Sequence, residues 1–164
     1  MKRLVLAGSL LLTILFGLIS CSDKMTPEQK AVIGTWVFSG GNNEQFGLPD
    51  DYKADITLTF DENGKFTMEG VAECPSIDVY VGHNWKGTYE VVGENINMKV
   101  KKDDFEVNLN REHYSSEAEY LQALAEQRDL FFRYDDVVEI TDKIQNIDGT
   151  YYIIEQDGTV LEKK

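Results

Sequence analysis

The sequence predicts an all-β domain, an antiparallel meander of eight to ten strands that closes into a barrel and carries one helix. Two observations support this prediction. Short segments in which apolar and polar residues alternate follow one another from residue 31 to residue 164, as in strands that have one buried and one solvated face. Most connections between these segments are short, which favours hairpins, because parallel strands need long crossovers.

The clearest alternation runs from Lys53 to Phe60 and resumes at Lys65. The intervening Asp61-Glu62-Asn63-Gly64 predicts a hairpin turn in which Gly64 or Asn63 takes a positive φ. Two further hairpins are predicted, with a type II′ turn starting at Gly93 and a type I′ turn at Asp157-Gly158. The remaining strands are expected at 33–39, 85–91, 96–100, 104–110, within 130–141, and at 151–155 and 159–162.

Residues 115–128 break the alternation and predict the helix. Ser115 or Ser116 can cap its first turn, which is rich in glutamate. An apolar stripe at helical spacing follows, made of Tyr120, Leu121, Leu124 and Ala125.

The N-terminus has the order of an export signal. Lys2 and Arg3 precede an apolar run that ends at Ile19 and is shorter than a membrane-spanning helix requires. Leu18-Ile19-Ser20-Cys21 resembles the lipobox of bacterial lipoproteins. The resemblance implies that residues 1–20 are removed, that acyl chains on Cys21 anchor the protein to a membrane, and that Ser22 directs it to the outer membrane. Which face of that membrane it occupies stays open, and an ordinary signal peptide is the alternative.

Residues 21–30 are polar and predict a tether, and residues 31–164 suffice for a single domain. The formal net charge is −13, and loss of Lys2 and Arg3 with the signal makes it −15. A nucleic-acid partner is therefore not expected, because phosphate binding requires clusters of Lys and Arg.

The first predicted strand reads Ile33-Gly34-Thr35-Trp36-Val37-Phe38, and Gly87-Thr88-Tyr89-Glu90-Val91 follows within the meander. This pattern resembles the Gly-x-Trp opening of the lipocalin family and is similar to the lipocalin-like lipoproteins of Bacteroidota. The resemblance implies a barrel in which Trp36 plugs one end and a cup at the other end holds one small, mostly apolar ligand.

The alternation nominates inward-facing residues that either line such a cup or fill it. Trp85 and Tyr89 slightly favour a cavity, because each carries a polar group that needs a partner when buried. The candidate lining residues are Trp36, Phe60, Phe66, Met68, Trp85, Tyr89, Met98 and Phe105.

Catalytic and metal-binding candidates are few. His83, His113 and Cys74 lack the close spacing of a metal site, and nothing around Cys74 indicates an activated thiol. The acidic pairs Asp50-Asp51, Asp103-Asp104 and Asp135-Asp136 fit turns better than a calcium loop. We therefore expect a binding protein with no metal, cofactor or enzymatic activity.

A second interpretation makes the barrel a rigid platform. Residues 40–52 form a long, turn-rich segment with aromatic side chains, and long loops on rigid scaffolds often carry function. In that case the partner is a protein or polysaccharide of the cell envelope, and a filled interior would favour it.

Overall fold

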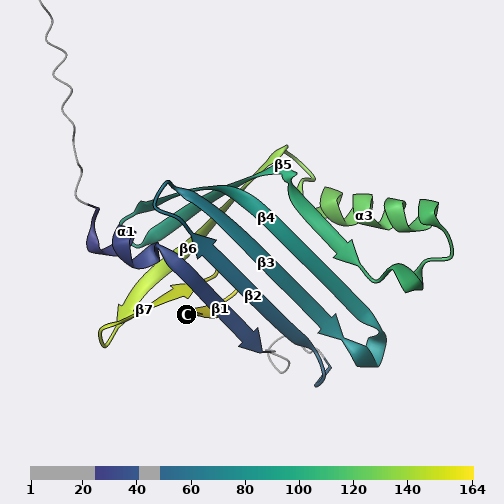
Figure 1. The fold of residues 1–164 in the computed structure, drawn as a ribbon, viewed down its shortest axis with the longest axis horizontal. Helices are drawn as coiled ribbons and strands as arrows, with labels where there is room; N and C mark the ends of the chain where they lie inside the picture. Colours follow the sequence, from purple (N-terminus) through teal and green to yellow (C-terminus); the bar gives the residue numbers. More distant parts are fainter. Residues whose placement is uncertain (1–24, 41–48) are drawn as a thin grey trace, which may run out of the picture.

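A computed structural model describes residues 25–40 and 49–164 and confirms the predicted fold class (Figure 1). Each strand pairs antiparallel with the next, and the last strand pairs with the first, which closes an eight-stranded barrel. The strands are β1 (Gly34–Gly40), β2 (Lys53–Phe60), β3 (Lys65–Cys74), β4 (Val79–Val92), β5 (Asn95–Leu109), β6 (Val137–Ile147), β7 (Thr150–Ile154) and β8 (Val160–Lys163).

The helices agree with the sequence in one case and differ in the other. The predicted helix is α3 (Glu117–Phe131), and Ser116 caps it by accepting a hydrogen bond from the backbone N–H of Glu119. A second, short helix, α1 (Pro27–Val32), occupies part of the expected tether. It forms because Thr26 and Gln29 cap each other reciprocally and proline stands in the first turn.

Residues 1–24, with the expected signal and Cys21, lie outside the described residues. Within the described ranges, no helix is long and apolar enough to cross a membrane. All eight strands lie between Gly34 and Lys163, so the strand pairs that close the barrel need no residue of the first 24.

The turns have the predicted glycine conformations, except that the type I′ turn lies at a different Asp-Gly pair from the predicted one. Gly64 has a φ of 74°, and the Asp61 carboxylate accepts hydrogen bonds from the backbone N–H groups of Asn63 and Lys65. Gly93 has a φ of 62° and is the first residue of a two-residue turn, as predicted. The type I′ turn expected at Asp157-Gly158 is wrong, because only Gly158 has a positive φ there.

A type I′ pair of positive φ angles occurs instead at Asp148-Gly149, between β6 and β7, with values of 53° and 89°. The sequence contains the same Asp-Gly dipeptide at both places. It therefore marks a turn without deciding its type.

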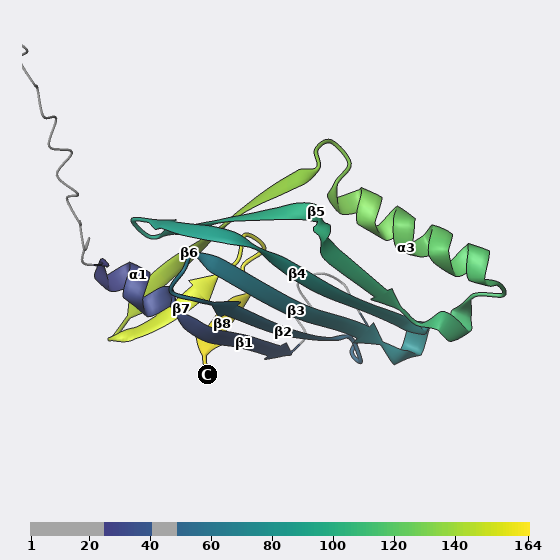
Figure 2. The same ribbon diagram turned by 45° about the horizontal axis from the view of Figure 1, so that its top comes forward.

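The segments expected as two strands at 96–100 and 104–110 are halves of the single long strand β5. Its first half, up to Lys101, pairs with both β4 and β6, whereas Phe105–Leu109 pairs with β4 alone. The closed part of the barrel therefore lies toward α1. At the other end the sheet continues as an open extension, and α3 lies beside the outer half of β5 (Figures 1 and 2).

The register of β4 against β5 breaks between Trp85 and Gly87, and this bulge explains why glycine stands at position 87. A Cβ atom there would lie 2.1 Å from the carbonyl oxygen of Lys99 and 2.7 Å from Cε1 of Phe66. Because one of these neighbours is backbone, a side chain cannot be accommodated by a rotamer change. Gly87 thus lets the Phe66 ring and the β5 backbone approach together.

We predict that Gly87→Ala lowers the free energy of unfolding by about 2 kcal/mol or more, because the backbone must shift. Gly70→Ala, on the neighbouring strand, is the control, since its new Cβ would meet only Met68 Cε at 3.7 Å and should change stability by less than about 0.5 kcal/mol. Urea denaturation of both variants checks the prediction. Equal stabilities would contradict this account of the bulge.

The end of the barrel next to α1 is plugged by Trp36, as the resemblance implied. Trp36 is fully buried, and its Nε1 donates a hydrogen bond of 2.7 Å to the carbonyl oxygen of Val32 in α1. Lys163 Nζ lies 5.3 Å from the centre of the Trp36 ring and donates to the carbonyl oxygen of Ala31. Two donors from the first and last strands, which pair with each other, therefore bind the end of α1.

We predict that Trp36→Phe costs about 1–3 kcal/mol more stability than Trp85→Phe. The two substitutions remove the same volume. Only Trp36 donates a hydrogen bond through its indole, whereas Trp85 Nε1 has no partner among the described residues. Chemical denaturation monitored by circular dichroism measures the difference, and a larger loss for Trp85→Phe would refute the assigned role of Trp36.

Candidate functional site

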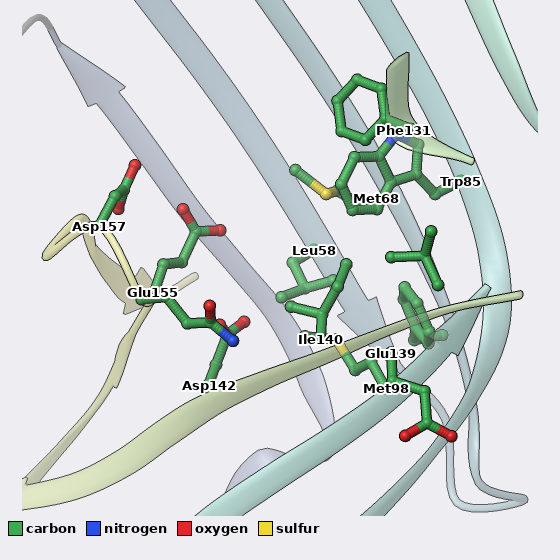
Figure 3. Close-up of a pocket in the computed structure, with 13 residues that line it drawn as sticks. Leu58, Met68, Trp85, Met98, Phe131, Glu139, Ile140, Asp142, Glu155 and Asp157 are labelled. Atoms are coloured by element: carbon green, nitrogen blue, oxygen red, sulfur yellow. The ribbon is translucent and has the colours of Figure 1, made fainter. Parts of the chain in front are cut away.

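A cavity of about 410 Å³ lies inside the barrel beyond the plugged end (Figure 3). Its apolar lining comes from several strands because register places the side chains in rows. Leu58 is opposite Met68, and Met68 is opposite Trp85, across β2, β3 and β4. On the facing wall, Met98 of β5 is opposite Ile140 of β6. The inward faces that the sequence predicted therefore enclose space instead of filling it completely.

Four of the eight nominated residues line this cavity, namely Phe66, Met68, Trp85 and Met98. Leu58, Val138 and Ile140 line it as well. Leu58 lies on the same face of the predicted strand 53–60 as Phe60 but was not nominated. The β6 residues were missed because the strand within 130–141 had no clear register in the sequence.

Trp36, Phe60 and Tyr89 do not line the cavity, which corrects their nomination. They belong to the filled end of the barrel, where the Phe60 ring contacts Tyr89 with centroids 4.7 Å apart. The Tyr89 hydroxyl donates a hydrogen bond of 2.6 Å to the carbonyl oxygen of Asp61 in the adjacent turn. Its polar group is therefore satisfied by the fold itself and is not available to a ligand.

Phe105 also lies outside the cavity, in an aromatic cluster at the end of α3. Its ring centroid is 4.9 Å from that of Phe131 and 5.6 Å from that of Trp85. Phe131 lines the cavity and contacts Trp85 and His83 edge to face. The last turn of α3 thus closes part of the cavity with one aromatic side chain.

Polar atoms within this cluster lack partners. His83 Nε2 and Trp85 Nε1 are buried and make no hydrogen bond to a described residue. Burial lowers the pKa of His83, which favours the neutral ring. His83 is therefore placed as an aromatic packing residue and not as a cation of the site.

The opposite side of the cavity carries three carboxyl groups, which we call the acidic wall: Asp142, Glu155 and Asp157 (Figure 3). Asp142 stands on β6 at an inward position between Ile140 and Ile144, and its residue is only 3% exposed. Glu155 and Asp157 follow β7 in the turn that leads to β8. The Asp157 carboxylate accepts a hydrogen bond from the backbone N–H of Thr159.

The acidic wall was not predicted from the sequence, although the alternation of β6 contains a departure that points to it. In the alternation of β6, Asp142 occupies a position that an apolar residue should hold. An acid on the inward face of a predicted strand is a departure that indicates a functional position. Glu155 ends the predicted strand 151–155 on the same face as Ile153 and carried the same signal. Asp157 carried none, since acids are ordinary in turns.

The environment of Asp142 and Glu155 disfavours negative charge. Burial, with a further contribution from Asp157, raises the pKa of Asp142 to about 7. Burial and the neighbouring Asp142 and Asp157 raise the pKa of Glu155 to about 7. Neither side chain has a hydrogen bond or an ion pair with a described residue, and the lining contains no Lys, Arg or His. Asp142 and Glu155 therefore have no compensating partner among the described residues.

The other titratable candidates lie apart from the cavity. Cys74 Sγ lies 3.4 Å from Asp51, which also accepts hydrogen bonds from Ser76 and so fixes the turn after β3. His113 Nε2 is 3.0 Å from the Asp78 carboxylate. Across the described ranges, no group of three or more His, Cys, Asp or Glu side chains is placed to hold a metal ion.

A scan of protein-family models and a search of curated proteins each returned no match for this chain.

We predict that the acidic wall makes the protein less stable as the pH rises from about 4 to about 7. The folded chain keeps protons on Asp142 and Glu155 at pH values where the unfolded chain has released them, so the free energy of unfolding falls across this window and then levels. His83, with its lowered pKa, acts in the opposite direction below about pH 6.5.

Asp142→Asn isolates the contribution of the acidic wall because it leaves His83 unchanged. Urea denaturation at about pH 5 and about pH 8 should show a smaller loss of stability in the variant than in the parent protein. Glu139→Gln, which removes an exposed carboxylate on the same strand, should retain the parental pH dependence. The same pH dependence in all three proteins would contradict the assignment.

Proposed function

We propose that the chain is a lipid-anchored, lipocalin-like binding protein whose barrel holds one small, largely apolar ligand. The single observation that carries the proposal is the cavity of about 410 Å³ with its apolar lining. This volume lies within the range of about 300–1,000 Å³ that is typical of small-molecule sites. Removing apolar surface from contact with water is favourable, so a cavity with this lining favours an apolar ligand over water.

Binding without catalysis fits the side chains that face the cavity. The lining contains no Ser, Thr, Cys, His or Lys that could act as a nucleophile. Asp142, Glu155 and Asp157 stand on one side, and Glu139 and Gln156 add a fourth carboxyl group and an amide. The rest of the lining is hydrocarbon, aromatic rings and thioether sulfur. Such a lining orients a ligand with one polar end and provides few groups for chemistry.

The membrane anchor is the second part of the proposal and rests on the lipobox-like tetrapeptide ending at Cys21. Several acyl chains on one residue hold a protein stably on a bilayer, here the outer membrane. The short helix α1 then joins the anchor to the plugged end of the barrel.

Labelled palmitate should be incorporated into the full-length chain in a bacterial host and not into Cys21→Ser. Cys74→Ser is the matched control and should be labelled like the parent. Labelling of the Cys21→Ser chain, or absence of label in the parent, would overturn the anchor.

The platform interpretation, with an envelope protein or polysaccharide as partner, has less support. A filled interior would have favoured it, and the interior contains a cavity instead. Residues 41–48 of its proposed loop lie outside the described residues.

We predict that the chain from Ser22 onward binds the uncharged fluorophore N-phenyl-1-naphthylamine saturably, and that Met68→Trp reduces this binding at least about tenfold by occupying the cavity. Thr67→Trp places the same indole one residue away on the exposed outer face and should leave binding unchanged. Fluorescence titration measures both. Absence of saturable binding to the parent chain, or equal binding by both variants, would refute the cavity as the site.

A further inference from the structure

We propose that the ligand is an amphiphilic amine, with an apolar body in the lining around Met68 and a cationic ammonium group against the acidic wall of Asp142, Glu155 and Asp157. This inference rests on the proposed function, because it names the ligand class of the same cavity. The head group of such a ligand is positively charged, whereas that of a fatty acid is negatively charged.

Asp142 is a buried acid whose carboxylate has no partner among the described residues. Its residue is 97% buried, it points into the cavity (Figure 3), and its carboxylate has no hydrogen-bond or ion-pair partner among the described residues. Buried carboxylates are normally paired, because an isolated one loses its hydration without compensation. The missing partner is therefore a hydrogen-bond donor that enters the cavity.

The side chains around Asp142 in the cavity are acidic or uncharged, which favours a ligand with a positive charge. Three carboxyl groups line one side of the cavity, from β6 and from the turn after β7, where Asp157 is exposed. The residue opposite Asp142 on β5 is the apolar Ile96. Lys143, the next residue on β6, is exposed on the outer face, and Glu139 on that face is paired with Lys99. A primary ammonium supplies three donors and a positive charge. An anionic head group would meet three like charges.

The cavity favours an organic cation over a metal ion. The described residues contain no group of three or more His, Cys, Asp or Glu side chains with the placement that a metal ion needs. A bare ion would also leave the apolar lining of Leu58, Met68 and Trp85 without an occupant. An amine with an alkyl or aryl body satisfies both parts of the cavity at once.

The test uses three probes with the same chain length and different head groups, octylamine, octan-1-ol and octanoate, on the chain from Ser22 onward. Circular dichroism first verifies that every protein used is folded. Each probe competes with N-phenyl-1-naphthylamine at about pH 8, where Asp142 and Glu155 are largely ionised. We expect octylamine to compete at a concentration about tenfold lower than octan-1-ol, and octanoate to compete most weakly.

Two double variants show whether the acidic wall causes this preference. Asp142→Asn with Glu155→Gln should bring octylamine within about twofold of octan-1-ol, while the affinity for octan-1-ol stays unchanged. Glu94→Gln with Glu162→Gln removes the same charge from exposed positions outside the cavity lining and should keep the preference. The preference of the parent protein should also weaken at about pH 5.5, where Asp142 and Glu155 take up protons and octylamine stays cationic.

The outcomes separate this inference from the proposed function. If octan-1-ol and octylamine compete equally in the parent protein, or if the preference survives loss of Asp142 and Glu155 charges, the amine assignment is overturned and the binding function stands. If the parent chain does not bind the fluorophore at all, the proposed function itself is wrong.

Discussion

Closure of the barrel depends on the contacts around Trp36, because the pairing that joins its first and last strands is short. β8 has four residues, and the register between β1 and β8 covers only Trp36 with Lys163 and Val37 with Glu162. Trp36 and Lys163 also donate hydrogen bonds to consecutive carbonyl groups at the end of α1. One short helix thus satisfies donors from both edges of the seam. Gly34, with a φ of 127° and Lys163 Cε 3.0 Å from its would-be Cβ, allows this close approach.

The position of the cavity follows from the plug at the α1 end of the barrel. Phe60, Phe66 and Tyr89 fill the interior next to it, and the bulge at Gly87 separates this filled half from the open extension of β4 and β5. Between the two lies the cavity, bounded on one side by Phe131 from α3 and on the other by the turn between β7 and β8. The turn between the short strands β7 and β8 therefore places the half-buried Glu155 and the exposed Asp157 on the side of the cavity where Asp142 stands on β6.

Much of this could be read from the sequence, for identifiable reasons. Alternation in 53–60 and 65–68 fixed which faces are inward, because strand period leaves only two choices, and Gly64, Gly93 and Ser116 marked boundaries through local chemistry. The continuity of β5 could not be read, since Lys101 to Asp104 is a polar break that the sheet absorbs as a bulge. The division between plug and cavity also escaped prediction. Phe60 and Met68 carry the same inward pattern, and only three-dimensional packing separates the filled end from the lined one. The acidic wall combines Asp142 of β6 with Glu155 and Asp157 of the turn after β7, and the pairing of Lys143 with Ile154 between these two strands brings them together.

The central claim is that the barrel encloses an apolar cavity which a small molecule occupies. Native mass spectrometry of the protein isolated from its own host, compared with Met68→Trp produced in the same way, tests this most directly. The account predicts that the parent protein carries an additional small, non-covalent mass, released on activation as a positively charged species, and that Met68→Trp lacks it. A parent protein that carries only its polypeptide and acyl mass, or an adduct of equal abundance on Met68→Trp, would contradict it.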